Sequence, residues 1–149
     1  MKEEAREMRV LRSVGAIFAG LLTIFVTHNG IDAVLHATGV FPPLGEPMAD
    51  GLFVLALAYR IVFSVVGCYV TARLAAHHPM GHALTLSGIG VVLSSLGALA
   101  TIGQGPEFGP IWYPLALVAV SLPSGWAGGA LRLRELRGRT TPEVAPAVA

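Results

Sequence analysis

Residues 13–35 read SVGAIFAGLLTIFVTHNGIDAVL, an apolar run that contains no lysine, arginine or glutamate. A helix rises about 1.5 Å per residue, so a run of this length can cross the roughly 30 Å hydrocarbon core of a bilayer. Three further runs have the same character, at residues 51–74, 82–102 and 111–131. The sequence therefore predicts an all-α polytopic membrane protein, a bundle of four transmembrane helices.

The composition points to the same class of protein. Of the 149 residues, 54% are hydrophobic and only 13% are charged, and the mean hydropathy is +0.67. Soluble domains carry about 25% charged residues, and a soluble fold of this length cannot hide so much apolar surface. We expect one membrane domain over residues 13–131, a cytoplasmic N-terminal segment over 1–12, and a basic tail over 132–149 that is disordered from residue 138 onward.

The first apolar run is predicted to stay in the protein rather than to act as a signal peptide. A signal peptide needs a short apolar core followed by a small-residue cleavage site. Here the run is long and leads into THNG. We therefore expect a retained first helix.

The basic residues predict the orientation of the bundle. Nine of the ten lysines and arginines lie in residues 1–12, at Arg73 beside the turn AAHHPMG, or in residues 132–139. The connections GVFPPLGEPMADG and GQGPEFGP contain no lysine or arginine. Since basic residues flank spans on the cytoplasmic side, both termini are predicted to be cytoplasmic and the two Pro/Gly-rich connections to lie outside.

Three titratable residues share one face of the first predicted span. His28, Asp32 and His36 are spaced by four, and each step of four residues turns a helix by about 40°. The two histidines are about 12 Å apart along the axis, so one zinc ion cannot easily bind all three side chains. An adjacent pair supplies at most two ligands.

Arg60 is the predicted partner of Asp32. Charged residues inside a membrane are costly and usually pair with one another. Arg60 lies about 13 Å below the start of the second span, and a long basic side chain can reach toward the interface. We expect His28 beside this pair, with Tyr59 and Asn29 completing the hydrogen bonds. The candidate ligand-binding or proton-handling residues are His28, Asn29, Asp32, His36, Tyr59 and Arg60.

These residues leave three interpretations open. They form a structural ion pair that locks the first helix to the second, a binding or proton-handling site, or part of a metal site. The structural ion pair is the first of these interpretations; the physical case for the second is that histidine titrates near neutral pH and that buried acid–base clusters often serve function. We predict no complete metal site, no cofactor and no catalytic residue.

Small and hydroxyl side chains follow one face of each later span. Such faces allow helices to pack closely in lipid. Helix packing is the first interpretation; a narrow polar path through the bundle and self-association are the alternatives, the last suggested by a GxxxG at residues 125–129. The positions are Ser64, Gly67 and Thr71; Ser87, Gly90, Ser94, Gly97 and Thr101; and Ser121, Ser124, Gly125 and Gly128.

Other potential motifs are weak. His77, His78 and His82 lie in or beside the AAHHPMG turn without an acidic or thiol companion, so a polar turn is expected there. Cys68 is the single cysteine and is expected to fill a small space in the packing. The sequence contains no G-x-S-x-G, H-E-x-x-H, P-loop or G-x-G-x-x-G motif.

The segments HNGIDAVLHATGVFPP, LAYRIVFSVVGCYVTARLA and HHPMGHALTLSGIGVVLSSLGALAT resemble those of an uncharacterised family of small bacterial integral membrane proteins with four helices. The resemblance covers about residues 12–134 and implies the bacterial inner membrane, with no activity attached. The chain is also similar to small multidrug transporters in length and number of spans. Those transporters are built around a glutamate in the first helix, and this first span has none.

Three functional classes remain open. The cluster binds a small ligand or handles protons in a transport-like protein; or the chain is a non-catalytic accessory component that works through partner helices; or it is a membrane enzyme. We expect the enzyme least, because no nucleophile or second carboxylate accompanies the aligned residues. The expected partners are the lipid bilayer and a second copy of the chain, and not nucleic acid.

Overall fold

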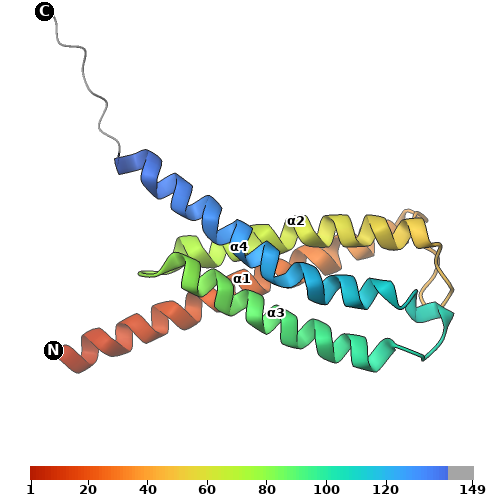
Figure 1. Cartoon of the computed structure of the whole chain (residues 1–149), viewed down its shortest axis with the longest axis horizontal. Helices are drawn as coiled ribbons and strands as arrows, with labels where there is room; N and C mark the ends of the chain where they lie inside the picture. Colours follow the sequence, from red (N-terminus) through yellow and green to blue (C-terminus); the bar gives the residue numbers. More distant parts are fainter. Residues whose placement is uncertain (141–149) are drawn as a thin grey trace, which may run out of the picture.

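The computed structural model describes residues 1–140. Within that range the chain forms α1 (Lys2–Ala37), α2 (Asp50–Leu74), α3 (Pro79–Thr101) and α4 (Trp112–Thr140), with a short 3₁₀ helix, η1 (Pro106–Phe108), before α4. The four long helices lie side by side as a bundle (Figure 1). The prediction of an all-α four-helix bundle is confirmed.

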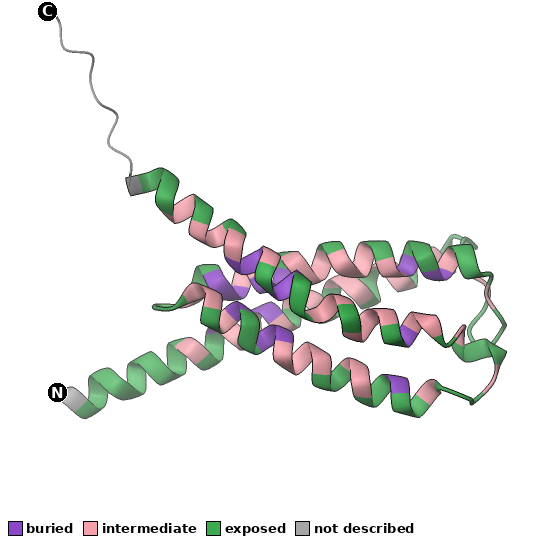
Figure 2. Ribbon diagram, in the orientation of Figure 1, coloured by how far each residue is buried: buried purple, intermediate pink, exposed green. Residues whose placement is uncertain are grey.

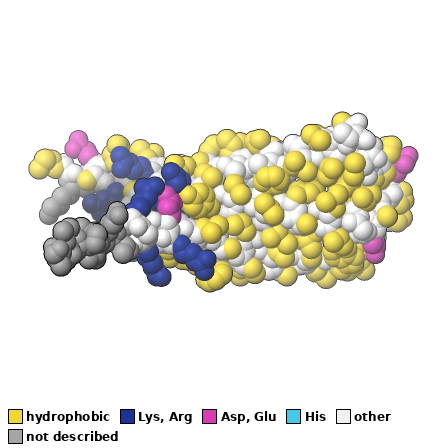
Figure 3. Space-filling view, turned by 90° about the horizontal axis from the view of Figure 1, so that it is seen from above, with side chains coloured by type: hydrophobic (Ala, Val, Ile, Leu, Met, Phe, Trp, Pro, Cys, Tyr) yellow, Lys and Arg dark blue, Asp and Glu magenta, His cyan; other side chains and the backbone are white. Residues whose placement is uncertain are grey.

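The two ends of the bundle differ in chemistry. The connections over residues 38–49 and 102–111 meet at one end, here called the loop end, and the turn between α2 and α3 lies at the other (Figure 1). Lysine and arginine side chains gather at that other end, here called the basic end, and none is seen at the loop end in the same view, whereas acidic side chains are seen at both ends (Figure 3). The charge asymmetry read along the sequence is therefore also an asymmetry in space.

All four helices are long and apolar enough to cross a membrane. Large apolar side chains are exposed along their outer faces, among them Phe18, Phe25 and Leu99. Exposed and half-buried residues alternate along the outside of the bundle (Figure 2). Contiguous apolar surface of this extent is rare on soluble monomers and suits contact with lipid.

Missing side chains let α1 and α2 approach each other closely. A Cβ atom added at Gly67 would lie 2.8 Å from the carbonyl oxygen of Gly20, and one added at Gly20 would lie 2.5 Å from the carbonyl oxygen of Gly67. One turn further, the Thr71 hydroxyl donates a hydrogen bond of 3.1 Å across the interface to the carbonyl of Ala16. Close backbone contact with an interhelical hydrogen bond is a typical interface in lipid.

The same device joins α4 to its neighbours. The Ser87 hydroxyl of α3 donates to the carbonyl of Ser121 at 2.7 Å. A Cβ atom at Gly128 would lie 2.7 Å from Cys68 Cβ and from the Tyr69 backbone nitrogen of α2. Gly67, Gly128 and Ser87 of the expected small-residue faces therefore act in helix packing. Ser64, Ser94 and Ser121 instead line a cavity, and a Cβ atom at Gly97 would meet nothing within 4 Å.

The tightest packing lies in the half of the bundle toward the basic end. Cys68, Ala72, Ala83 and Leu86 form a buried apolar cluster, against which three partly buried residues of α1 pack, namely Ile17, Leu21 and Ile24. Cys68 is buried and free, as its expected packing role requires.

Both α1 and α4 extend beyond the bundle at the basic end (Figure 1). α1 is helical from Lys2, so most of the segment 1–12 is helix, and α4 is helical through Thr140. Residues 138–140, expected to begin a disordered tail, are the last turn of α4. The rest of that expectation falls on residues 141–149, outside the described residues.

Candidate functional site at the loop end

Asp32 of α1 accepts hydrogen bonds from two residues of α2. Arg60 Nη2 donates to Asp32 Oδ2 at 2.5 Å and forms an ion pair with it. The Tyr59 hydroxyl donates to Asp32 Oδ1. The expected Asp32–Arg60 pair is therefore present, and both carboxylate oxygens have partners. Each side chain of the ion pair is 27% exposed, so the pair is neither sealed in the core nor on the open surface.

The two histidines lie on opposite sides of this pair along α1, with His28 toward the bundle centre and His36 toward the loop end. His28 Nε2 is 3.1 Å from the carbonyl oxygen of Arg60, so it binds the backbone of the residue whose side chain holds Asp32. His36 turns away toward the loop, where Nδ1 lies 2.7 Å from the carbonyl oxygen of Pro42 and the ring packs edge-on against Phe41. His28 thus joins the pair as expected, and His36 contacts the connection after α1 instead.

Asn29 does not belong to the site, and its predicted role in completing the hydrogen bonds is wrong. Its side-chain amide donates to the carbonyl of Phe25 on its own helix at 2.7 Å, and the residue is exposed. The reason is helical geometry. Asn29 follows His28 by one residue, so it lies about 100° around the helix from His28 and about 60° from Asp32, at a position where its side chain is exposed.

Three cavities adjoin at Arg60. A loop-end cavity of about 200 Å³ is lined by Asp32, His36 and Tyr59 together with Arg60. A central cavity of about 170 Å³ lies among all four helices and is lined by His28, Arg60 and the hydroxyl-bearing residues Ser64, Ser94 and Ser121. A third, lateral cavity of about 340 Å³ lies between α3 and α4, and Arg60 again forms part of its wall.

The Arg60 side chain has donor capacity left over. Its Nε atom is the one buried side-chain nitrogen or oxygen in residues 1–140 without a hydrogen-bond partner. A guanidinium has five N–H donors, and a buried donor without a partner costs about 1–3 kcal/mol. Water in the neighbouring cavities, or a bound ligand, is the kind of partner that removes such a cost.

The sequence did not indicate the role of Tyr113. This residue of α4 lines both the loop-end cavity and the lateral cavity, and its ring packs against Phe53 of α2 at a centroid distance of 5.0 Å. Glu107 of η1 also lines the loop-end cavity. The one feature of the sequence that could have indicated these two residues is their position, since both lie beside the start of the fourth span, at the end of the bundle where Asp32 was expected.

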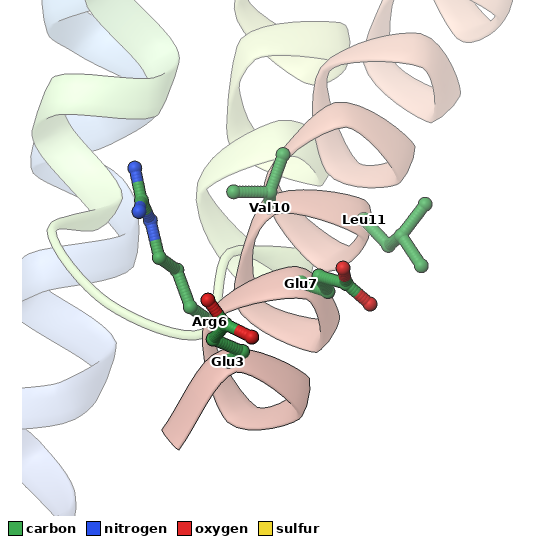
Figure 4. A pocket seen from close by; sticks show the side chains of 5 residues that line it. All are labelled: Glu3, Arg6, Glu7, Val10 and Leu11. Atoms are coloured by element: carbon green, nitrogen blue, oxygen red, sulfur yellow. The ribbon is translucent and has the colours of Figure 1, made fainter. Parts of the chain in front are cut away.

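The remaining candidates do not form sites. The His77 ring contacts the rings of His78 and His82 at the basic end, but within residues 1–140 no group of three or more His, Cys, Asp or Glu side chains is placed to hold a metal ion. A hollow of about 580 Å³ is lined, among the described residues, by α1 alone (Figure 4). Its side chains Arg6 and Leu11 point to different sides of that helix, so they do not converge on a ligand.

Comparison with family models, with curated proteins and with solved structures finds no match to this chain. The resemblance to small bacterial four-helix membrane proteins therefore stays a prediction from the sequence pattern.

Proposed function

We propose that the chain is a multi-pass protein of the bacterial inner membrane, with both termini in the cytoplasm and the loop end outside. The proposal is supported by the four apolar helices and by the concentration of lysine and arginine at the basic end. The spans proposed are residues 13–35, 51–74, 82–102 and 111–131.

Within that setting, we propose that Asp32 and Arg60 bind a small ligand or exchange protons in a transport-like process. The observation that carries this proposal is the position of Arg60 as a shared wall of three cavities. A pair that served only to lock two helices needs no space around it. Here space adjoins the pair toward the loop end, toward the bundle centre and between α3 and α4.

The chemistry of the pair suits exchange of partners. A proton on Asp32 removes its negative charge and weakens its hold on Arg60. A small anion can then take the guanidinium, which binds carboxylates and phosphates through its fork of donors. Conversely, a small cation can compete for the Asp32 carboxylate. His28, bonded to the Arg60 backbone, links such a change to the central cavity.

One alternative has an observation of its own. Tyr59 and Arg60, both on α2, hold the same carboxylate of α1. This arrangement is also what a helix-locking ion pair in a non-catalytic accessory protein requires.

Proton flux into vesicles tests the proposal. Purified protein is placed in liposomes that contain a pH-sensitive dye, and acid is added outside. We expect internal acidification faster than in protein-free vesicles, and loss of this difference in Asp32→Asn. Asn29→Ala is the matched control on the same helix, because the exposed Asn29 side chain bonds to the carbonyl of Phe25 on its own helix, and it should behave as the wild type.

A second measurement separates ligand binding from proton exchange. Thermal stability is recorded with added acetate as an anionic probe and methylammonium as a cationic probe. A shift that Asp32→Asn abolishes and Asn29→Ala keeps supports a ligand site even without proton flux. If neither flux nor shift occurs, the cluster is a structural lock and the accessory function replaces the transport-like one.

A further inference from the structure

A second polar cluster lies at the basic end, outside the site described above. Glu135 of α4 is its only carboxylate. Arg132 Nη1 donates to it at 2.7 Å, Arg139 Nη2 at 2.8 Å and Arg73 Nη1 of α2 at 3.1 Å. The Tyr69 hydroxyl donates to the same carboxylate at 2.9 Å. These five residues, Tyr69, Arg73, Arg132, Glu135 and Arg139, are here called the arginine–glutamate cluster.

The cluster has too many cations for its one anion. Three arginines share a single carboxylate, so two positive charges have no acidic partner within it. Arg73 and Arg139 are also 50% and 65% exposed, and each binds Glu135 through one terminal nitrogen. Arg73 Nη1 also donates to the Tyr69 hydroxyl at 2.8 Å. Because a guanidinium has five N–H donors, both exposed groups keep donors with which to bind an anionic group such as phosphate.

An apolar groove begins directly beside these donors. It measures about 350 Å³ and is lined by Val65, Val66 and Tyr69 of α2 and by Leu131 and Glu135 of α4. Val66 and Leu131 are 40% and 47% exposed, so the groove is open on the outer side of the bundle. Its apolar residues lie on the bundle side of the cluster, where the apolar parts of both helices begin.

Close approach of α2 and α4 fixes the floor of the groove. Gly128 leaves no side chain between the helices, and a Cβ atom there would lie 2.7 Å from the carbonyl oxygen of Val65. Because the two backbones touch at this level, the groove lies over a close helix contact, with Val66 of α2 and Leu131 of α4 both in its lining.

We propose that this groove binds an anionic phospholipid, with its phosphate on Arg73 and Arg139 and one acyl chain along Val66 and Leu131. The match is one of charge and of polarity. Cationic donors lie at the edge of the apolar surface, where phosphates lie in a bilayer, and apolar side chains continue into the depth of the acyl chains. A basic pocket between spans is a recognised arrangement for acidic lipid headgroups. The inference rests on the proposed membrane setting and is independent of the function proposed for the loop end.

Lipid retention in native mass spectrometry tests the proposal. Full-length protein is extracted from nanodiscs containing equal amounts of phosphatidylglycerol and phosphatidylcholine, and lipids that stay bound are counted. We expect selective retention of phosphatidylglycerol. Arg73→Gln removes a charge-assisted hydrogen bond to phosphate and should lower that retention about tenfold.

Arg134→Gln is the matched control, because Arg134 lies at the same end of α4 and is exposed outside the cluster. It removes the same charge and should change retention by less than about twofold. Equal losses in Arg73→Gln and Arg134→Gln overturn the proposal, since they reveal only a general attraction of anionic lipid to a basic surface.

Val66→Phe separates the acyl-chain groove from the arginines and leaves every charge in place. It fills the groove and should lower phosphatidylglycerol retention as well. Unchanged retention in this variant, or equal retention of both lipids by the wild type, also overturns the proposal. Glycerol phosphate at the same concentration should not bind, because it lacks the acyl chain.

Discussion

At the scale of single residues, the Asp32–Arg60 pair determines how the loop end behaves. Asp32 has donors on both carboxylate oxygens, whereas Arg60 keeps a buried Nε without a partner. The two ends of the ion pair are therefore unequally satisfied. Removing Asp32 leaves a charged group without its anion, whereas removing Arg60 leaves a carboxyl group without its cation. The two single variants should therefore lose different amounts of stability.

Asp32→Asn should be the more damaging of the two. It leaves the Arg60 guanidinium charged and without its anion, and breaking a buried pair in this way costs about 3–5 kcal/mol, less where water and partial exposure reduce the burial. Arg60→Leu should cost less, because a stranded carboxyl group can bind a proton. The measurement is the thermal stability of both variants in detergent or lipid.

The double variant Asp32→Asn with Arg60→Leu should regain much of the lost stability. Strictly additive losses contradict a direct interaction between the two residues. Recovery of stability together with a lasting loss of proton flux or ligand shift is expected of a functional pair, whereas a helix-locking pair has no activity to lose.

Glu135 illustrates residue chemistry at the basic end. It lies one turn beyond Leu131, outside the proposed fourth span. Hydrogen bonds from Arg132 and Tyr69, together with the charges of Arg132 and Arg73, lower the pKa of the Glu135 carboxyl from its ordinary value. A carboxyl whose pKa is lower in the folded than in the unfolded state stabilises the fold above its unfolded pKa. That contribution is lost as the pH falls through the folded pKa.

Acidification should therefore loosen the arginine–glutamate cluster. Between about pH 7 and about pH 3, the wild type should lose more thermal stability than Glu135→Gln, which has no carboxyl to titrate. Parallel pH profiles of the two proteins argue that the hydrogen bonds to Glu135 do not stabilise the fold.

At the scale of helices, the contact between α1 and α2 depends on two glycines without side chains. Gly20 and Gly67 face each other so closely that either backbone blocks a Cβ atom on the other. This contact lies toward the basic end from Asp32 and Arg60, and it sets the separation of the two helices that carry the pair.

Gly20→Ala should push α1 away from α2. Overpacking of this kind costs about 1–3 kcal/mol, and it should also weaken the Thr71–Ala16 hydrogen bond next to it. Gly15→Ala is the matched control on the same helix, since a Cβ atom there meets nothing within 4 Å. That control should leave stability unchanged or raise it by up to about 1 kcal/mol. The measurement is the thermal midpoint of each variant, and equal midpoints for Gly20→Ala and Gly15→Ala refute close packing at Gly20.

At the scale of the whole molecule, orientation in the membrane is the first property to measure. Reporter fusions after Pro47 and after Pro106 should read outside, and a fusion after Pro79 should read inside. The physical reason is that the two connections that contain Pro47 and Pro106 have no lysine or arginine, whereas these residues are abundant at the basic end. A reversed reading at any of the three sites excludes the proposed topology.

The second property to measure is whether water reaches the central cavity. In a Cys68→Ala background, Ser64→Cys places a thiol on the cavity wall, and Val62→Cys places one on the exposed outer face of the same helix. A membrane-impermeant thiol reagent added at the loop end should label the first and not the second. Failure to label Ser64→Cys indicates that the cavities are closed to the outside.

The sequence predicted the parts of this molecule that depend on length and on charge. Apolar runs of sufficient length led to four helices, and the cost of an isolated charge in an apolar run led from Asp32 to Arg60. Helix rotation was harder to predict, because a helix that is apolar on most sides gives a weak periodic signal. Hence Tyr113 of α4 was not assigned to the site, and Asn29 was wrongly included.

The arginine–glutamate cluster could not be predicted for a related reason. It depends on α4 continuing as a helix past its apolar part, so that Arg132, Glu135 and Arg139 share one face at spacings of three and four. The composition of residues 132–149 indicated a basic tail and not that geometry. Its tertiary partners, Tyr69 and Arg73, are visible only once α2 and α4 are packed together.

The unequal packing of the two halves has an electrical consequence. In the orientation proposed above, water filling the loop-end and central cavities would carry the outside potential down to Leu86, which forms part of the central cavity's wall and of the apolar cluster. Most of the membrane voltage would then fall across the dry half between Leu86 and the basic end. When one elementary charge crosses the whole membrane voltage, its free energy changes by about 2.3 kcal/mol per 100 mV. A proton that stops at Asp32 has crossed little of this voltage, whereas one that passes the apolar cluster has crossed nearly all of it.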